Sequence, residues 1–105
     1  MVQVFTLLAI RDTSPHESAV YDTAEPGKAK LVIFKNTHNQ PISLQLQGSL
    51  NKEYTDPVNI GPAVTAPAGM TAPDYQWLRE PWWYLRIVAA AAVAPSSGQL
   101  DAWIE

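Results

Sequence analysis

The two histidines, His16 and His38, are the side chains best suited to bind a metal ion or to transfer a proton near neutral pH. A metal site needs three or four converging ligands, and these histidines lack the spacing that places two ligands on one face of a helix. The chain also has no cysteine, which excludes disulfides, thiolate catalysis and zinc ribbons. Both histidines lie in polar segments typical of loops, so we expect them at the surface and predict neither a metal nor a cofactor.

A catalytic serine would need a neighbouring base that a third group orients. The serines lie in expected turns or on the polar side of an expected strand, and the segment 95–98 lacks the pattern of a nucleophile elbow. The five glycines are isolated, so no glycine-rich phosphate loop is present. Two of the ten dispersed acidic residues could meet in the fold, but a chain with such short loops rarely builds the deep cleft that glycoside hydrolysis requires. We therefore expect no enzymatic activity.

The aromatic residues between positions 75 and 84 are the most informative group. Exposed Trp and Tyr rings offer flat apolar faces with a polar edge, which stack on sugar rings and anchor protein interfaces. The alternative is that these rings fill the core, and one of the adjacent Trp82 and Trp83 is expected to be buried because neighbours on a strand face opposite sides. We predict a partner-binding surface in which two arginines supply hydrogen bonds beside the rings. Its residues are Tyr75, Trp77, Arg79, Trp82, Tyr84 and Arg86.

The charges argue against two classes of partner. The formal net charge is −3, and the seven basic residues are scattered, whereas nucleic-acid binding depends on clustered Lys and Arg. The apolar run 87–94 is much shorter than the roughly 20 residues that span a bilayer. We expect no nucleic acid and no membrane as partner. Charged residues make up only 16% of the chain, against about 25% in typical domains, which favours a surface partly covered by other subunits.

Nine prolines leave few windows long enough for a helix, and the segments between them alternate apolar and polar residues as strands do. In the segment 42–47 the apolar residues Ile42, Leu44 and Leu46 alternate with polar ones. The segment 30–35 is apolar at every position between two lysines, which is typical of a central strand covered on both faces. A polar turn separates the two, so we predict a hairpin of 30–36 with 40–50.

The same alternation predicts a second hairpin of 82–94 with 99–104, with a turn at 95–98. Further strands are expected at 2–10, 18–23, 58–60 and 63–66, and a single helical turn at 73–80. The main alternative is a helix over the alanine run 89–92, because alanine has a high helix propensity. Seven to eight short strands with regular turns indicate an all-β chain, in which residues 1–105 form a single antiparallel β-sandwich or jelly-roll-like domain.

Two stretches resemble small β-sandwich virion structural proteins of tailed bacteriophages, a group that includes capsid decoration and auxiliary proteins. The first is Asn36 with the run 40–49, and the second is 83–87 leading through 94–98 to 99–101; together the likeness covers residues 29–104. The resemblance implies a non-enzymatic virion component, assembled in the host cytoplasm, that decorates or stabilises the capsid. It also implies contacts with the major capsid protein or another virion protein, and a homo-oligomer, with a trimer favoured.

The main alternative function is a carbohydrate-binding module in which Tyr75, Trp77 and Trp82 stack on sugar rings. For the virion role, we expect segments near the termini to add to the sheet of a neighbouring protein by edge pairing. These segments are Val2 to Leu8 and Trp103 to Glu105.

Overall fold

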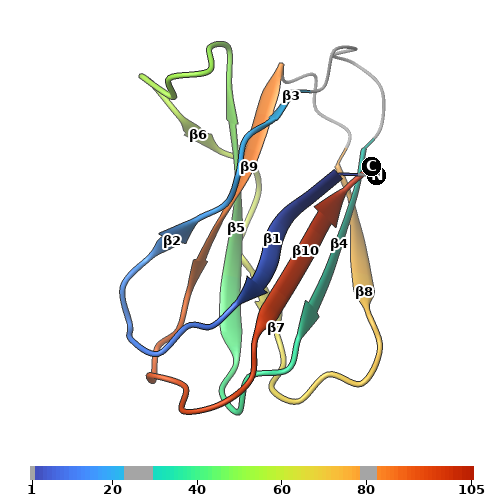
Figure 1. The fold of residues 1–105 in the computed structure, drawn as a ribbon. Helices are drawn as coiled ribbons and strands as arrows, with labels where there is room; N and C mark the ends of the chain where they lie inside the picture. The colour runs from blue at the N-terminus through green and yellow to red at the C-terminus, as the bar shows by residue number, and fades with distance from the viewer. Residues whose placement is uncertain (1, 23–29, 79–82) are drawn as a thin grey trace.

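The computed structural model describes residues 2–22, 30–78 and 83–105, and in these residues the chain forms ten strands and no helix. Two antiparallel sheets pack face to face, as Figure 1 shows. The predicted all-β class and the sandwich are confirmed. No helix in the described ranges has the length and apolar character needed to cross a membrane.

The first sheet has four strands, and the second has two long central strands flanked by short ones. The four-stranded sheet runs in the order β1 (Val2–Leu8), β10 (Leu100–Ile104), β4 (Lys30–Asn36), β8 (Asp74–Leu78). The six-stranded sheet has β9 (Tyr84–Ala90) and β5 (Ile42–Ser49) at its centre; β2 (His16–Glu17) and β3 (Tyr21–Asp22) pair with β9, and β6 (Val58–Asn59) and β7 (Val64–Ala66) pair with β5.

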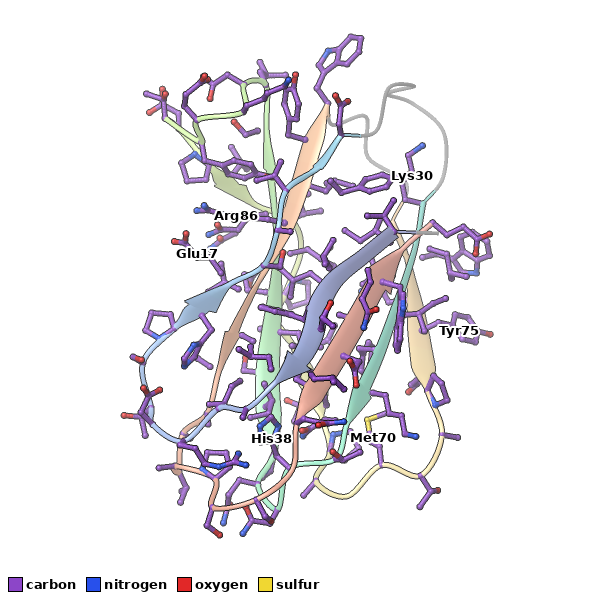
Figure 2. All side chains as sticks on the ribbon, viewed as in Figure 1. Glu17, Lys30, His38, Met70, Tyr75 and Arg86 are labelled. Atoms are coloured by element: carbon purple, nitrogen blue, oxygen red, sulfur yellow. The ribbon has the colours of Figure 1, made fainter. Side chains whose placement is uncertain are left out.

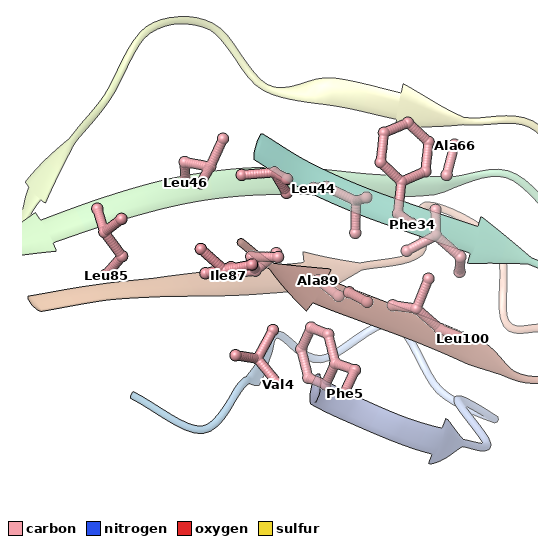
Figure 3. Packing of buried hydrophobic residues seen from close by; sticks show 14 of the residues in the cluster. Val4, Phe5, Phe34, Leu44, Leu46, Ala66, Leu85, Ile87, Ala89 and Leu100 are labelled. Atoms are coloured by element: carbon pink, nitrogen blue, oxygen red, sulfur yellow. The ribbon is translucent and has the colours of Figure 1, made fainter. Parts of the chain in front are cut away.

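The core lies between the two sheets and is built by alternate residues of each long strand. In β5 the predicted inward residues Ile42, Leu44 and Leu46 are all buried, and Leu85 and Ile87 of β9 pack beside them (Figure 3). The four-stranded sheet contributes a matching row from β4 and β10. Burying one such side chain contributes about 1.5–3 kcal/mol, so this alternation is the main source of stability.

Neither predicted hairpin forms. β4 belongs to the four-stranded sheet and β5 to the six-stranded sheet, and β9 and β10 are separated in the same way. Alternation identifies which side chains face the core, but two strands with the core between them show the same pattern as two strands joined in a hairpin. The segments 37–41 and 91–99 therefore cross from one sheet to the other instead of turning within one sheet.

The prediction that both histidines lie at the surface is wrong for His38, which is fully buried in the first of these crossings. Its Nδ1 donates to Asn36 Oδ1 over 2.7 Å, and its Nε2 accepts the Ile10 N–H over 3.0 Å. These two bonds fix the neutral tautomer, and burial lowers the pKa of His38, with a smaller contribution from the charge of Arg11. A polar residue in a loop-like segment is thus part of the interior because it satisfies buried backbone groups.

Other local expectations have mixed outcomes. The helical turn predicted at 73–80 is wrong for the described residues, because residues 74–78 form β8 and pair with β4; positions 79 and 80 lie outside the described residues. The helix considered over 89–92 is also wrong, since β9 extends through Ala90. The strand expected at 18–23 is replaced by the two short strands β2 and β3, whereas the short strands expected near 58–60 and 63–66 are confirmed. Trp103 to Glu105 cannot add to a neighbour as an edge, because β10 lies between β1 and β4.

Candidate binding surface

The outward side of β4 carries two apolar residues, although it faces away from the core, and Lys35 is its third outward residue. Val32 and Phe34 point into the core and are buried, so the alternate residues Leu31 and Ile33 point outward. Both outward side chains are only half-buried. The prediction that this strand is covered on both faces is therefore wrong for the described residues, and the apolar residues at every position mark a surface instead of a second core.

The strands beside β4 place aromatic rings around these two residues. Residues directly opposite each other in an antiparallel pair share a face of the sheet. Ile33 is opposite Tyr75 of β8 on one side and Trp103 of β10 on the other, and Leu31 is opposite Trp77. We call these five side chains the aromatic face: Leu31, Ile33, Tyr75, Trp77 and Trp103.

The aromatic face is most exposed along β8. Tyr75 retains 61% of its accessible surface and Trp77 retains 53%, and Figure 2 shows Tyr75 projecting away from the sandwich. Trp103 is half-buried between its neighbours on β1 and β4. A row of large apolar side chains on the solvent side of a sheet is unusual, because the outward residues of an antiparallel sheet are normally polar.

Polar groups border the aromatic face on the side of β1. Gln3 is opposite Trp103, and its Nε2 donates to Asp101 Oδ1 over 3.0 Å. The same oxygen accepts the Leu7 N–H over 2.9 Å, where Leu7 has a φ of 47° beside a register shift in β1. Asp101 thus stabilises the irregular course of β1 and is engaged in doing so, which makes it a boundary of the surface rather than a free charge.

The chemistry that this surface offers is packing and stacking. In residues 2–22, 30–78 and 83–105, no three His, Asp or Glu side chains converge in a way that would hold a metal ion. A cavity of about 270 Å³ lies away from the aromatic face, lined by Ser49, Leu50, Asn51, Asp56 and Val58. Its lining includes no pairing of a nucleophile with a base, since Ser49 Oγ lies near the amide oxygen and backbone of Asn51.

The structure separates the predicted partner-binding residues. Tyr75 and Trp77 lie on the aromatic face, whereas Tyr84 and Arg86 lie on β9 of the six-stranded sheet. The other two predicted residues, Arg79 and Trp82, lie outside the described residues. Of the adjacent tryptophans, Trp83 precedes β9 and is 45% exposed.

Arg86 is held within the second sheet by several contacts. Its Nε donates to Gln47 Oε1 over 2.9 Å, and its Nη1 donates to Glu17 Oε2 over 3.2 Å (Figure 2). Its guanidinium also lies 4.2 Å from the centre of the Tyr54 ring. Burial raises the pKa of Tyr54 to about 12, although the charge of Arg86 opposes this rise. Arg86 therefore joins β2, β5 and the loop that holds Tyr54, and its Nε and Nη1 both donate to side chains within the fold.

Sequence reasoning missed three members of the aromatic face. The sequence predicts a second buried side for Leu31 and Ile33, and it predicts Trp103 as part of a terminal segment that pairs with a neighbour, not as part of a binding face. The available signal was the apolar residue at every position of 31–34, which identifies a strand with two apolar sides but does not say whether each side has a partner.

Comparison with known proteins finds likeness in fold. The crystal structure of PirA matches with a TM-score of 0.66 at 14% sequence identity, covering 100% of this chain and 94% of PirA. The PBSX exported protein XepA matches with a TM-score of 0.61 at 17% identity, covering 98% of this chain and 36% of XepA, so the chain spans about a third of that protein. No family model and no curated protein matches the sequence. At these identities the likeness is one of fold alone.

Proposed function

We propose that this chain is a non-enzymatic binding domain that attaches to another protein of a larger assembly through its aromatic face. The observation that carries the proposal is the aromatic face itself, because the opposite side of the same sheet already forms the core. Trp and Tyr are enriched at the energetically important positions of protein interfaces, and charged residues are depleted there. A sheet surface with two exposed rings and polar groups along one border fits this description.

We further propose that the assembly is a virion, in which the chain decorates or stabilises the capsid by contacting the major capsid protein or another virion protein. The support is the resemblance of residues 29–104 to small structural proteins of tailed bacteriophages, together with the low charged fraction of 16%. The shared fold with the PBSX exported protein XepA is compatible with this setting. A stable contact of this kind buries more than about 1,000 Å², for which the aromatic face would supply the centre.

Co-sedimentation tests this proposal. Particles purified from cells that produce the phage encoding the chain should carry it through a density gradient, and Trp77→Ala should reduce the bound fraction about tenfold or more, because a ring at the centre of an interface contributes about 2 kcal/mol or more. Trp83→Ala is the matched control, since it removes an exposed ring of similar accessibility that precedes β9 in the other sheet. A chain that remains in the soluble fraction, or equal losses in the two variants, contradicts the proposal.

A carbohydrate-binding module is the second candidate, and one observation favours it. Tyr75 and Trp77 are both exposed and lie two residues apart on one strand, so their rings are about 7 Å apart along the strand, a spacing that can place two rings under one glycan. Binding on a glycan array that is lost in Trp77→Ala and kept in Trp83→Ala would favour this function. If the chain binds particles but binds no glycan on the array, the carbohydrate-binding function is excluded.

A further inference from the structure

The edges of the two sheets are protected from pairing with other chains, with one exception. Edge strands expose unpaired backbone groups, and proteins limit such pairing with short strands, bulges or charges. The edge strands of the six-stranded sheet are β2, β3, β6 and β7, which have only two or three residues each. They are too short to template a long pairing with another strand.

The β1 edge of the four-stranded sheet is protected by irregularity. Its register with β10 shifts twice, between Gln3 and Phe5 and again between Phe5 and Leu8. The positive φ of Leu7 and its bond to Asp101 hold the second of these irregularities in place. A bulged edge twists away from the plane of the sheet, so β1 offers a poor template.

The β8 edge has none of these features. Residues 74–78 pair with β4 at five consecutive positions with no shift in register. Its one charge, Asp74, is at the first position, and its interior holds neither proline nor lysine. No other strand in the described part of the chain pairs with its free side.

We propose that β8 pairs with β8 of a second copy of this chain, antiparallel about a two-fold axis at Gln76. Two four-stranded sheets would thereby join into one continuous sheet. This register uses all five residues of the strand and places Tyr75 opposite Trp77 of the second copy, twice by symmetry. Cross-strand aromatic pairs stabilise antiparallel sheets.

A second copy fits this edge better than an unrelated strand because β8 is self-complementary. In this register each Asp74 is opposite Leu78 of the other copy and the two carboxylates lie at opposite ends of the pair, so no like charges face each other. A two-fold contact uses the same patch on both subunits and closes at a dimer, which avoids open-ended assembly. The pairing does not depend on the proposed attachment to a virion, and it would place the two aromatic faces side by side.

Light scattering and sedimentation equilibrium on the full chain test this pairing. A pair of five-residue strands is a small contact, so we expect weak association, and the mass should rise towards twice 11.5 kDa between about 1 µM and 1 mM. Gln76→Glu places two carboxylates opposite each other at the axis, each also near Asp74 of the other copy, and should weaken dimerisation about tenfold or more. Thr6→Glu adds the same charge to the exposed β1 edge and should leave dimerisation unchanged.

A charge exchange separates pairing from misfolding. Gln76→Glu mixed with an equal amount of Gln76→Lys should restore a dimer that Gln76→Glu alone does not form, because opposite charges then meet at the axis. A wild-type chain that stays monomeric to about 1 mM, a trimer, or a mixture that stays monomeric would overturn the proposal. Failure of the virion proposal is distinguishable, because Trp103→Ala lies away from β8 and should remove particle binding while leaving the dimer intact.

Discussion

His38 shows how one residue connects the interior of the sandwich to solution pH. Its ring is neutral in the fold, because protonation of Nε2 would replace the bond from the Ile10 N–H with two opposed donors. Burial lowers the pKa of His38 below its ordinary 6.5, so between 6.5 and the folded value the unfolded chain binds more protons than the folded chain. The free energy of unfolding should therefore be independent of this group above pH 6.5 and should fall as the pH drops below it.

We expect the wild-type chain to lose up to about 1.4 kcal/mol of unfolding free energy between pH 7.5 and pH 5.5 through this group. Urea denaturation at the two pH values measures the loss. His38→Gln, which cannot titrate, should be less stable at both values but should show a smaller difference between them. An equal pH dependence in wild type and His38→Gln would contradict the assignment.

Gly98 is required where the segment 91–99 passes close to the segment 37–41. Its φ is +91°, and a Cβ at this position would collide with the backbone of Thr37 and His38. We expect Gly98→Ala to lower the free energy of unfolding by at least about 2 kcal/mol, measured by urea denaturation. Gly69→Ala is the matched control, because Gly69 also has a positive φ, +62°, but open space at the Cβ position. Its loss should be limited to the backbone strain of about 1–2 kcal/mol.

For single residues, the sequence indicated which side chains are suited to binding, but it did not indicate which distant segments pack against each side chain. Tyr75 and Trp77 could be selected because exposed rings are suited to binding, and both are exposed. The burial of His38 could not be predicted, because it depends on Ile10, a residue far away in the sequence whose N–H needs an acceptor. Interactions of this type are set by the approach of distant segments, which local composition does not reveal.

Among the elements, β9 is paired with β2, β3 and β5 through its backbone, and the Arg86 side chain adds contacts from β9 to Glu17, Gln47 and Tyr54. We expect Arg86→Ala to lower the free energy of unfolding by about 1–2 kcal/mol, since it removes the contacts with Gln47 and the Tyr54 ring; the pair with Glu17 adds little because Glu17 is 61% exposed. Arg86→Lys should recover only part of this loss, because an ammonium cannot reproduce the planar contacts. Urea denaturation measures the free energy of unfolding of both variants. If Arg86→Ala has the same free energy of unfolding as the wild type, this role is contradicted.

The same variant addresses the earlier prediction that Arg86 contributes to partner binding. If Arg86 acts only within the fold, particle binding by folded Arg86→Ala should match that of the wild type. A loss of binding in a variant whose folding is intact would instead extend the surface to the six-stranded sheet.

Strands could be predicted where one side of the alternation is polar, as in β5, where Ser43 and Gln45 separate the buried Ile42, Leu44 and Leu46. β8 was missed because Pro73 and Asp74 resemble the start of a helix, and because the strand is only five residues long. The pairing of β8 with β4 decides its conformation, and this is a long-range contact.

At the scale of the whole molecule, the fold class followed from the sequence but the topology did not. The prolines leave few windows for helices, and strands with alternating residues have one apolar side that must be buried, which favours two sheets packed face to face. The assignment of β4 and β5 to different sheets depends on crossings such as the one stabilised by His38 and Asn36, and the alternation is identical for either arrangement.

The position of β10 between β1 and β4 has a consequence for the order of folding. Every strand of the six-stranded sheet precedes β10 in the sequence, whereas β1 pairs with β10 alone among the described strands, so β1 joins its sheet through a contact between segments that are far apart in the sequence. The aromatic face includes Trp103 of that last strand. Because pairing between segments distant in the sequence must first overcome the entropy of closing a long loop, we expect the β1–β10 pair, and with it the final position of Trp103, to form late in folding.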